Sequence, residues 1–386
     1  MIMVLKIRIL LGKLRLWGVK GVWEYVLRLA KQRRLIRNLV ANAKKEGNDH
    51  IRGITLVGPM RTSSSLSKVM RDFAYALKDA GIPFQTYDNG STCEVPDEDV
   101  DGILTSLEDF RVNKYTHVVE MFADPIFEKA GIHTHRIAFW EFDSGFTEAR
   151  PDMLGSQSVI AMSDFNADYY RRVYASGNVT KVHKILYPFR YNAQVTDFEA
   201  LQARDRYGIH KDAFMVFYNF DFRSSYGRKN PDSLVRAFSQ AFKGVGDVVL
   251  VFKTMGAKQC TEKLAELKDL IETCEMESQT VLINSYIPQH DLYALTKASD
   301  VYCSLHRGEG LGLGIAEAMC MGKPVIISDW SAPTEFCSDE NSFRIPVRIV
   351  SVPEDGKDHI LYQWVRTWAE PDVACAAKAL RRLYED

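Results

Sequence analysis

The stretch of sequence that decides the fold is HRGEGLGLGIAEAM, at residues 306–319. It follows a strand-like run at 300–305 and opens a helix-like run that ends near Gly322. We therefore expect a strand, a glycine-rich turn and a helix start in direct succession. Glycines let a ligand approach the backbone, and the unpaired N–H groups of a first helical turn attract anions. The pattern predicts a site for phosphate.

Two glutamates stand eight positions apart in this stretch. We expect Glu317 in the first helical turns, where it can accept hydrogen bonds from a sugar diol. We expect Glu309 in the loop before the helix, facing whatever binds beyond the phosphates. The alternative interpretation is an ordinary turn between a strand and a helix, with two solvated glutamates.

This arrangement resembles the E-x7-E signature of the retaining glycosyltransferases of family 4, which have the GT-B fold. The similarity extends from residues 285–288 through 299–300 to 333–336. It implies an α/β chain with two Rossmann-like domains, each a doubly wound parallel sheet, that face each other across a cleft. It also implies a nucleotide-diphosphate sugar as the donor substrate.

The composition is typical of a globular protein with two domains. The chain has 386 residues, of which 46% are hydrophobic and 26% charged,. Its seven cysteines are scattered without a C-x-x-C pair, which favours reduced thiols in a cytoplasmic protein over a zinc site,. No uncharged apolar run approaches the roughly 20 residues that span a bilayer.

Residues 1–50 carry a net charge of +9, so the rest of the chain carries −10. We interpret them as a basic helical extension that lies on an anionic membrane surface, at the inner face of the cell membrane. The alternative is an extension that packs on the protein itself. The acidic remainder argues against a nucleic acid partner.

Beyond residue 50, strand-like and helix-like runs alternate, as in a parallel sheet with helices on both faces. The first strand-like runs lie at 53–58, 82–87, 116–121, 136–140 and 158–162. They predict an acceptor-side domain over 51–189. The polar stretch 190–205 predicts a linker. Residues 206–386 are expected to form the domain that binds the nucleotide sugar.

A second group of charged residues lies at 217–231, between a strand-like run and a helix start. Its cations Arg223, Arg228 and Lys229 can neutralise the negative charge that develops on a diphosphate leaving group. The run is similar to the phosphate-binding Arg and Lys of the family. Arg223 and Lys229 have the closest spacing to that pair, and Arg228 can substitute for either. A solvated basic loop is the alternative.

Further donor contacts follow from the same resemblance. Residues Tyr286 and Ile287 are expected at the nucleotide base, although they can equally form a simple strand-ending turn. The backbone amides of the glycine-rich turn are expected at the diphosphate: Gly310, Leu311, Gly312 and Leu313.

The acceptor side resembles the family less closely. The first loop has Ser63 and Ser64 where the family commonly has glycines, and serines can bind hydroxyls or cap a helix,. The run FWEFD at 139–143 offers Glu141 and Asp143, whose carboxylates can bind acceptor hydroxyls or act as a base. The acidic residues 97–99 formally match a metal-binding D-x-D, but they read as a solvated loop, so no metal and no other cofactor is expected.

The sequence thus predicts a retaining, metal-independent hexosyltransferase. It would move a sugar from a nucleotide diphosphate to a glycan or lipid-linked acceptor, as in surface polysaccharide assembly. Glu309, Lys229 and Arg223 are the predicted catalytic residues. Two alternatives stay open: a GT-B nucleotide-sugar epimerase, and a catalytically silent scaffold or sensor that binds a nucleotide sugar.

Overall fold

The computed structural model describes residues 51–62, 64–89, 100, 102–106, 108–112, 114–121, 127, 134–146, 158–175, 181–191 and 194–386. The described residues form two compact units. The first draws on 51–139 and 158–190, and the second on 140–146 and 191–386. The basic extension 1–50 lies outside the described residues, and so do the predictions made for it. None of the helices in the described ranges is both long and apolar enough to cross a lipid bilayer.

The first unit is built on a six-stranded parallel sheet in the order β2-β1-β3-β4-β5-β6. Its strands are β1 (Ile51–Gly58), β2 (Phe84–Asp88), β3 (Tyr115–Glu120), β4 (Thr134–Ala138), β5 (Ser158–Ala161) and β6 (Lys181–Lys184). The helices in the described part of this unit are α2 (Ser65–Asp79) and α5 (Asp164–Tyr174).

Local chemistry explains how this sheet is held. The side chain of Ser64 caps α2 by accepting from the backbone N–H of Ser67 at 3.2 Å,. The neighbouring strands β3 and β4 place Glu120 beside Arg136, and the two buried side chains form an ion pair at 2.8 Å. A buried charge needs such a partner, so the pair fixes the register of the two strands.

The second unit has its own six-stranded parallel sheet in the order β12-β11-β10-β7-β8-β9, and a separate antiparallel hairpin of β13 and β14. Its strands are β7 (Phe214–Asp221), β8 (Val248–Met255), β9 (Thr280–Asn284), β10 (Val301–Ser304), β11 (Val325–Ser328), β12 (Phe343–Ile345), β13 (Val347–Ser351) and β14 (Thr367–Pro371). Its helices are α6 (Asp197–Arg206), α7 (Tyr226–Lys229), α8 (Pro231–Phe242), α9 (Thr261–Thr273), α10 (Gln289–Ala298), α11 (Leu313–Cys320) and α12 (Val373–Glu385).

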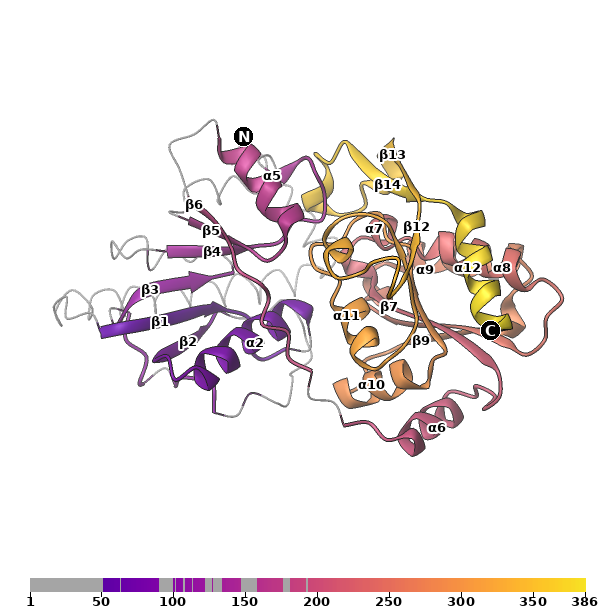
Figure 1. Cartoon of the computed structure of the whole chain (residues 1–386), viewed down its shortest axis with the longest axis horizontal. Helices are drawn as coiled ribbons and strands as arrows, with labels where there is room; N and C mark the ends of the chain where they lie inside the picture. Colours follow the sequence, from indigo (N-terminus) through magenta and orange to yellow (C-terminus); the bar gives the residue numbers. More distant parts are fainter. Residues whose placement is uncertain are drawn as a thin grey trace. The chain divides into compact units, whose positions relative to one another are not determined.

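Helices cover both faces of this second sheet. Helices α8, α9 and α12 lie on one face, and α10 and α11 lie on the other (Figure 1). The central strands are therefore mostly apolar and deeply buried, as in β8, where seven of eight residues are buried,. Because all six strands are parallel, their carboxyl ends share one edge, which is where open sheets of this kind bind ligands.

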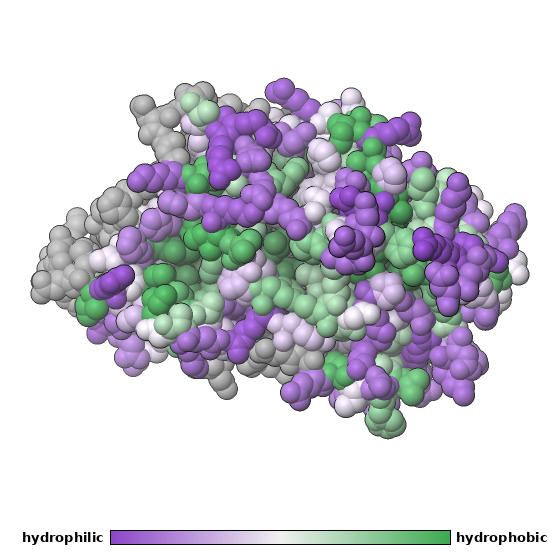
Figure 2. All heavy atoms as spheres, viewed as in Figure 1, coloured by the Kyte–Doolittle hydropathy of each residue, from purple (hydrophilic) through white to green (hydrophobic). Residues whose placement is uncertain are grey.

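The surface of the second unit contrasts with this core. Figure 2 shows hydrophilic side chains over much of its visible face, with hydrophobic residues in small groups between them. Exposed large apolar side chains such as Phe198 and Leu201 on α6 are few compared with the buried ones. Scattered apolar residues of this kind are normal on a globular surface.

The expected strands at 53–58, 82–87, 116–121, 136–140 and 158–162 coincide with β1 to β5 within a few residues. Two boundaries differ from the sequence-based ones. The stretch 190–205, expected as a linker, contains α6, which is fixed by a capping box of Thr196 and Glu199 and packs on α10,. Residues 140–146 belong to the second unit, because the Trp140 ring packs against Tyr362 at a centroid distance of 5.6 Å.

Candidate functional site

The candidate site lies at the carboxyl edge of the second sheet, where two loops meet. The loop after β7 contains α7 and ends at Asn230, a residue with the left-handed φ of 52° that asparagine tolerates,. Asn230 caps α8 by accepting from the backbone N–H of Ser233, and its amide donates to the carbonyl of Leu305 at 2.8 Å. One buried side chain thus joins the β7 loop to the end of β10.

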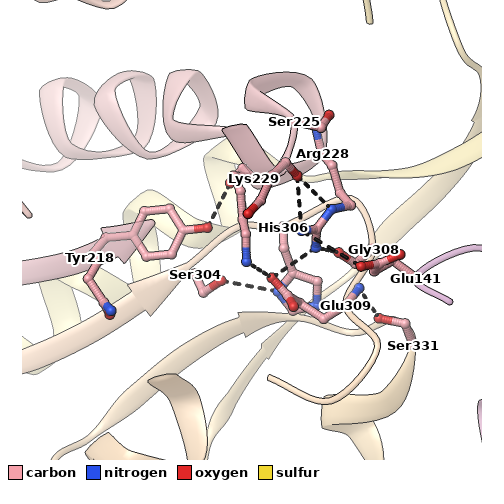
Figure 3. Close-up of polar contacts among 12 residues, drawn as sticks. Glu141, Tyr218, Ser225, Arg228, Lys229, Ser304, His306, Gly308, Glu309 and Ser331 are labelled. Carbon is pink, nitrogen blue, oxygen red and sulfur yellow. Dashed lines mark hydrogen bonds and ion pairs between the residues drawn. The ribbon is translucent and has the colours of Figure 1, made fainter. Parts of the chain in front are cut away.

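This junction brings Arg228, Lys229 and Glu309 together (Figure 3). The Nζ of Lys229 lies 2.5 Å from Oε1 of Glu309, and Nη1 of Arg228 lies 3.2 Å from the same oxygen. All three side chains are largely buried, with 17%, 4% and 12% of the Lys229, Arg228 and Glu309 side chains exposed. Two cations therefore converge on one carboxylate at the edge where a ligand is expected.

The cluster is held by contacts to the backbone as well as by charge. Arg228 donates to the carbonyl of Gly308 at 2.8 Å and to that of Ser224 at 3.0 Å. The N–H of Glu309 donates to Oγ of Ser331 at 2.9 Å. These hydrogen bonds fix the Arg228 side chain and the backbone of Glu309, so the cluster is preorganised,.

Burial and charge act in opposite directions on Glu309. Burial alone would raise the pKa of its carboxyl group, but the charges of Lys229 and Arg228 outweigh it and lower the pKa to about 2. Glu309 is therefore ionised at neutral pH. Arg228 keeps its charge as well: burial lowers its pKa, while Tyr362 and Glu309 raise it, and the net shift is upward.

A second arginine fastens the β7 loop to the C-terminal hairpin. Arg307 donates to the carbonyl of Gly227 at 2.8 Å and forms a two-pronged ion pair with Glu370 at 2.6 and 2.9 Å. Its guanidinium lies over the Trp368 ring, 4.4 Å from the centroid. A planar guanidinium suits both contacts, so Arg307 ties β14 to the loop that carries Lys229.

Helix α11 starts directly after Glu309 and the glycine-rich turn. Gly312 has a φ of 86°, which a side chain would strain, and no side chain caps the helix,. A Cβ on Gly314 would lie 2.4 Å from the Tyr302 hydroxyl oxygen, so only glycine fits in this first turn. The arrangement leaves the start of α11 as a backbone site with positive polarity.

Comparison with known proteins identifies this half of the chain. Residues 205–349 match the family model described as glycosyl transferases group 1. The match identifies a group 1 glycosyltransferase domain within the second unit. No match was found among curated proteins.

Solved structures of similar fold agree with the GT-B architecture. HepE from Anabaena, determined with UDP and glucose, has a TM-score of 0.59 at 16% identity over 87% of this chain and 90% of its own. WaaG, a glycosyltransferase involved in lipopolysaccharide biosynthesis, has a TM-score of 0.55 at 12% identity over 86% and 90%. Sucrose-phosphate synthase from Thermosynechococcus elongatus has a TM-score of 0.55 at 15% identity over 87% and 90%. At these identities the likeness establishes the fold alone.

Within the group 1 domain, the second predicted glutamate lies on α11 itself. Glu317 is 7% exposed and accepts a hydrogen bond from the Tyr293 hydroxyl of α10 at 3.1 Å. It is therefore oriented by a neighbouring helix. Tyr286 and Ile287 directly follow β9, the first 36% exposed and the second 8%.

Arg223 has a different place from the other two predicted cations. It forms a two-pronged ion pair with Asp221, the last residue of β7, with contacts at 2.7 and 3.0 Å. Arg228, named from the sequence as a substitute, is the arginine in contact with Glu309. The role of Arg223 in binding phosphate stays a prediction.

The residues predicted for the acceptor side are divided between the two units. Glu141 lies 3.9 Å from Arg228, and Asp143 lies 3.4 Å from the Thr367 hydroxyl, both within the second unit. Ser64 caps α2 in the first unit, and Ser63 lies outside the described residues. Glu141 thus adjoins the candidate donor site.

Sequence reasoning missed several supporting residues. His306 is fully buried, with its ring nitrogens 3.2 Å from the Ser304 hydroxyl and 3.2 Å from the Trp330 carbonyl. Burial lowers the pKa of His306, which favours a neutral ring beside Glu309. His306 could have been found from its position three residues before Glu309. Ser331 lies 22 positions after Glu309, and nothing in the sequence pointed to it.

In the described part of the chain, no group of three or more His, Cys, Asp and Glu side chains is placed to hold a metal, and residues 97–99 lie outside it.

Proposed function

We propose that this protein is a retaining, metal-independent glycosyltransferase that takes its sugar from a nucleoside diphosphate donor. The observation that carries the proposal is the convergence of Lys229, Arg228 and Glu309 at the start of α11, inside the group 1 domain. Cations beside a helix start are suited to a diphosphate, because both favour negative charge.

The charges of the cluster suggest how the leaving group is stabilised. Lys229 and Arg228 neutralise the diphosphate as its bond to the sugar breaks, together with the backbone amides of the turn at 310–313. We assign Arg223 the same role. Glu309 keeps the two cations in position and contacts the sugar. In the retaining mechanism that we propose, the acceptor attacks the face that the phosphate leaves, and the phosphate takes up the acceptor proton.

Glu317 is assigned to the ribose of the donor. Its carboxylate is largely buried and is oriented by the Tyr293 hydroxyl, and a carboxylate can accept several hydrogen bonds from sugar hydroxyls,. Tyr286 and Ile287, at the end of β9, are assigned to the base. UDP is the first nucleotide to test, since the HepE structure holds UDP and glucose.

For the acceptor we propose a glycan or a lipid-linked saccharide, in the assembly of a surface polysaccharide at the inner face of the cell membrane. The net charge of +9 on residues 1–50 supports a position at an anionic membrane,. Glu141 and Asp143 are proposed to contact the acceptor, and Glu141 is the better placed because it lies 3.9 Å from Arg228.

A thermal-shift panel of UDP, GDP, ADP and TDP tests the donor site first, since a ligand that binds only the folded state raises the melting temperature. Wild-type protein should respond to at least one of them. Glu317→Ala should lose about 1–3 kcal/mol of affinity for that nucleotide in calorimetry. Unchanged binding by Glu317→Ala would remove Glu317 from the site, and no response from the wild type to any of the four would contradict the proposed function.

A further inference from the structure

Lys253 is a buried cation that the site described so far does not use. It lies third from the end of β8 and is 5% exposed. Among the described residues, its ammonium makes no hydrogen bond and no ion pair, and Asp221 is the group that attracts it at longer range. A buried charge without a partner is costly, so its presence at a ligand-binding edge calls for a function.

The register of the sheet shows which way Lys253 points. Lys253 pairs with Asn219 of β7, so the two side chains leave the sheet on the same face,. Asn219 accepts a hydrogen bond from the Tyr302 hydroxyl at 2.8 Å, and its Oδ1 lies 3.1 Å from where a Cβ on Gly314 would be. Lys253 therefore faces the side of the sheet on which α11 begins.

The strand order places Lys253 between the two ends of the proposed nucleotide site. β8 lies between β7, whose loop carries Arg228 and Lys229, and β9, which leads to Tyr286 and Ile287. A nucleotide that reaches from the phosphate cluster to the base contacts has to cross the carboxyl end of β8.

We propose that the Lys253 ammonium binds an anionic oxygen of the donor diphosphate, as a third cation beside Arg228 and Lys229. The inference rests on the proposed function and adds a residue to its donor site. Burial lowers the pKa of Lys253 to about 8, and the attraction of Asp221 opposes that shift. A bound phosphate would give Lys253 the directly contacting anion that it lacks among the described residues.

The test compares Lys253→Met with wild type by titration calorimetry against UDP, GDP, ADP and TDP. Methionine keeps an unbranched stem of similar length in the core and removes the charge. The exposed Lys258, five residues further along the chain, provides the matched control, Lys258→Met. We expect Lys253→Met to bind the preferred nucleotide about 10- to 100-fold more weakly, the range for one charged hydrogen bond. Lys258→Met should bind within about twofold of wild type.

A readout without nucleotide separates a binding role from a structural one. Because Lys253 has no partner in the described structure, Lys253→Met should melt at or above the wild-type temperature while it binds more weakly. Lys253→Gln is the second variant if the methionine variant does not fold. Equal nucleotide affinity in wild type and a folded Lys253 variant would overturn this inference alone. If the wild type binds none of the four nucleotides, the proposed function falls and this inference falls with it.

Discussion

Lys229 and Glu309 are 80 positions apart in the sequence, and their side chains meet at 2.5 Å. The contact joins the loop after β7 to the loop before α11, so two separate crossovers of the sheet supply one charged cluster. Because Arg228 contacts the same carboxylate oxygen, Glu309 holds two cations in the loop before α11. The consequences of this arrangement can be measured.

Glu309→Gln should separate nucleotide binding from sugar transfer. The amide removes the negative charge that competes with phosphate for Lys229 and Arg228, so nucleoside diphosphate binding should be at least as tight as in wild type. Transfer should fall by about 100-fold or more, the usual cost of losing one group that acts on the transition state. Steady-state kinetics and calorimetry measure the two effects. Glu340→Gln, the same change at an exposed loop position, is the control and should match wild type.

The same carboxylate should contribute to acid stability. Its folded-state pKa of about 2 lies below the unfolded value of about 4.3, so the stabilisation is present above pH 4.3 and is lost as pH falls towards 2,. Urea unfolding of wild type and Glu309→Gln at several pH values isolates this group, since the other carboxyl groups are common to both proteins. Wild type should be the more stable above about pH 4.5, and its advantage should shrink as the pH falls. A difference that does not change with pH would contradict the assignment.

The outcome shows which parts of the molecule a sequence can predict. Hydrophobic runs such as 248–252 and 301–305 predict buried parallel strands, and the glycine-rich turn predicts the start of α11. Both patterns can be recognised because they lie within short stretches of sequence. The choice between Arg223 and Arg228 was not readable in this way. Both lie on one short loop, and only their contacts in the fold distinguish them. Arg223 pairs with Asp221. Arg228 contacts Glu309 and donates to the Gly308 carbonyl.

Contacts between distant segments set the remaining limits. The run at 139–143 follows a strand of the first unit, so spacing alone assigns it to that unit. The Trp140 ring is instead packed with Tyr362, more than two hundred residues later, and this contact places Glu141 beside Arg228. Lys253 shows the same limit: as a lysine within an apolar strand, it reveals its orientation only through the register with Asn219.

Arg307→Lys should weaken the support of the phosphate loop. Lysine retains the charge but cannot form the two-pronged pair with Glu370 while also donating to the Gly227 carbonyl,. We expect a loss of about 1–3 kcal/mol in the free energy of unfolding and a lower kcat. Urea titration and transfer kinetics test this, with Arg348→Lys on the exposed side of β13 as the control. Wild-type values for both quantities would show that Arg307 does not position the loop.

Gly314→Ala tests whether the start of α11 has to lie close to the sheet. Alanine favours helices, so at an open site it would stabilise the protein. Here its Cβ would lie 2.4 Å from the Tyr302 hydroxyl oxygen, so the first turn of α11 must shift or the tyrosine must move. We expect Gly314→Ala to lower the melting temperature and to weaken nucleoside diphosphate binding by about tenfold, because the backbone amides of that turn are displaced. Gly246→Ala is the control, since nothing lies within 4 Å of its added Cβ.

A double variant that combines Gly314→Ala with Tyr302→Phe tests whether the Tyr302 hydroxyl causes the loss of stability and binding. The double variant lacks the hydroxyl that the new methyl group meets, so it should recover part of the stability and binding lost by Gly314→Ala, after correction for the effect of Tyr302→Phe alone. The Asn219 side chain, whose Oδ1 would lie 3.1 Å from the Cβ, can turn away once its hydrogen bond to Tyr302 is gone. Additive effects of the two substitutions would mean that the close approach of α11 to β10 does not govern nucleotide binding.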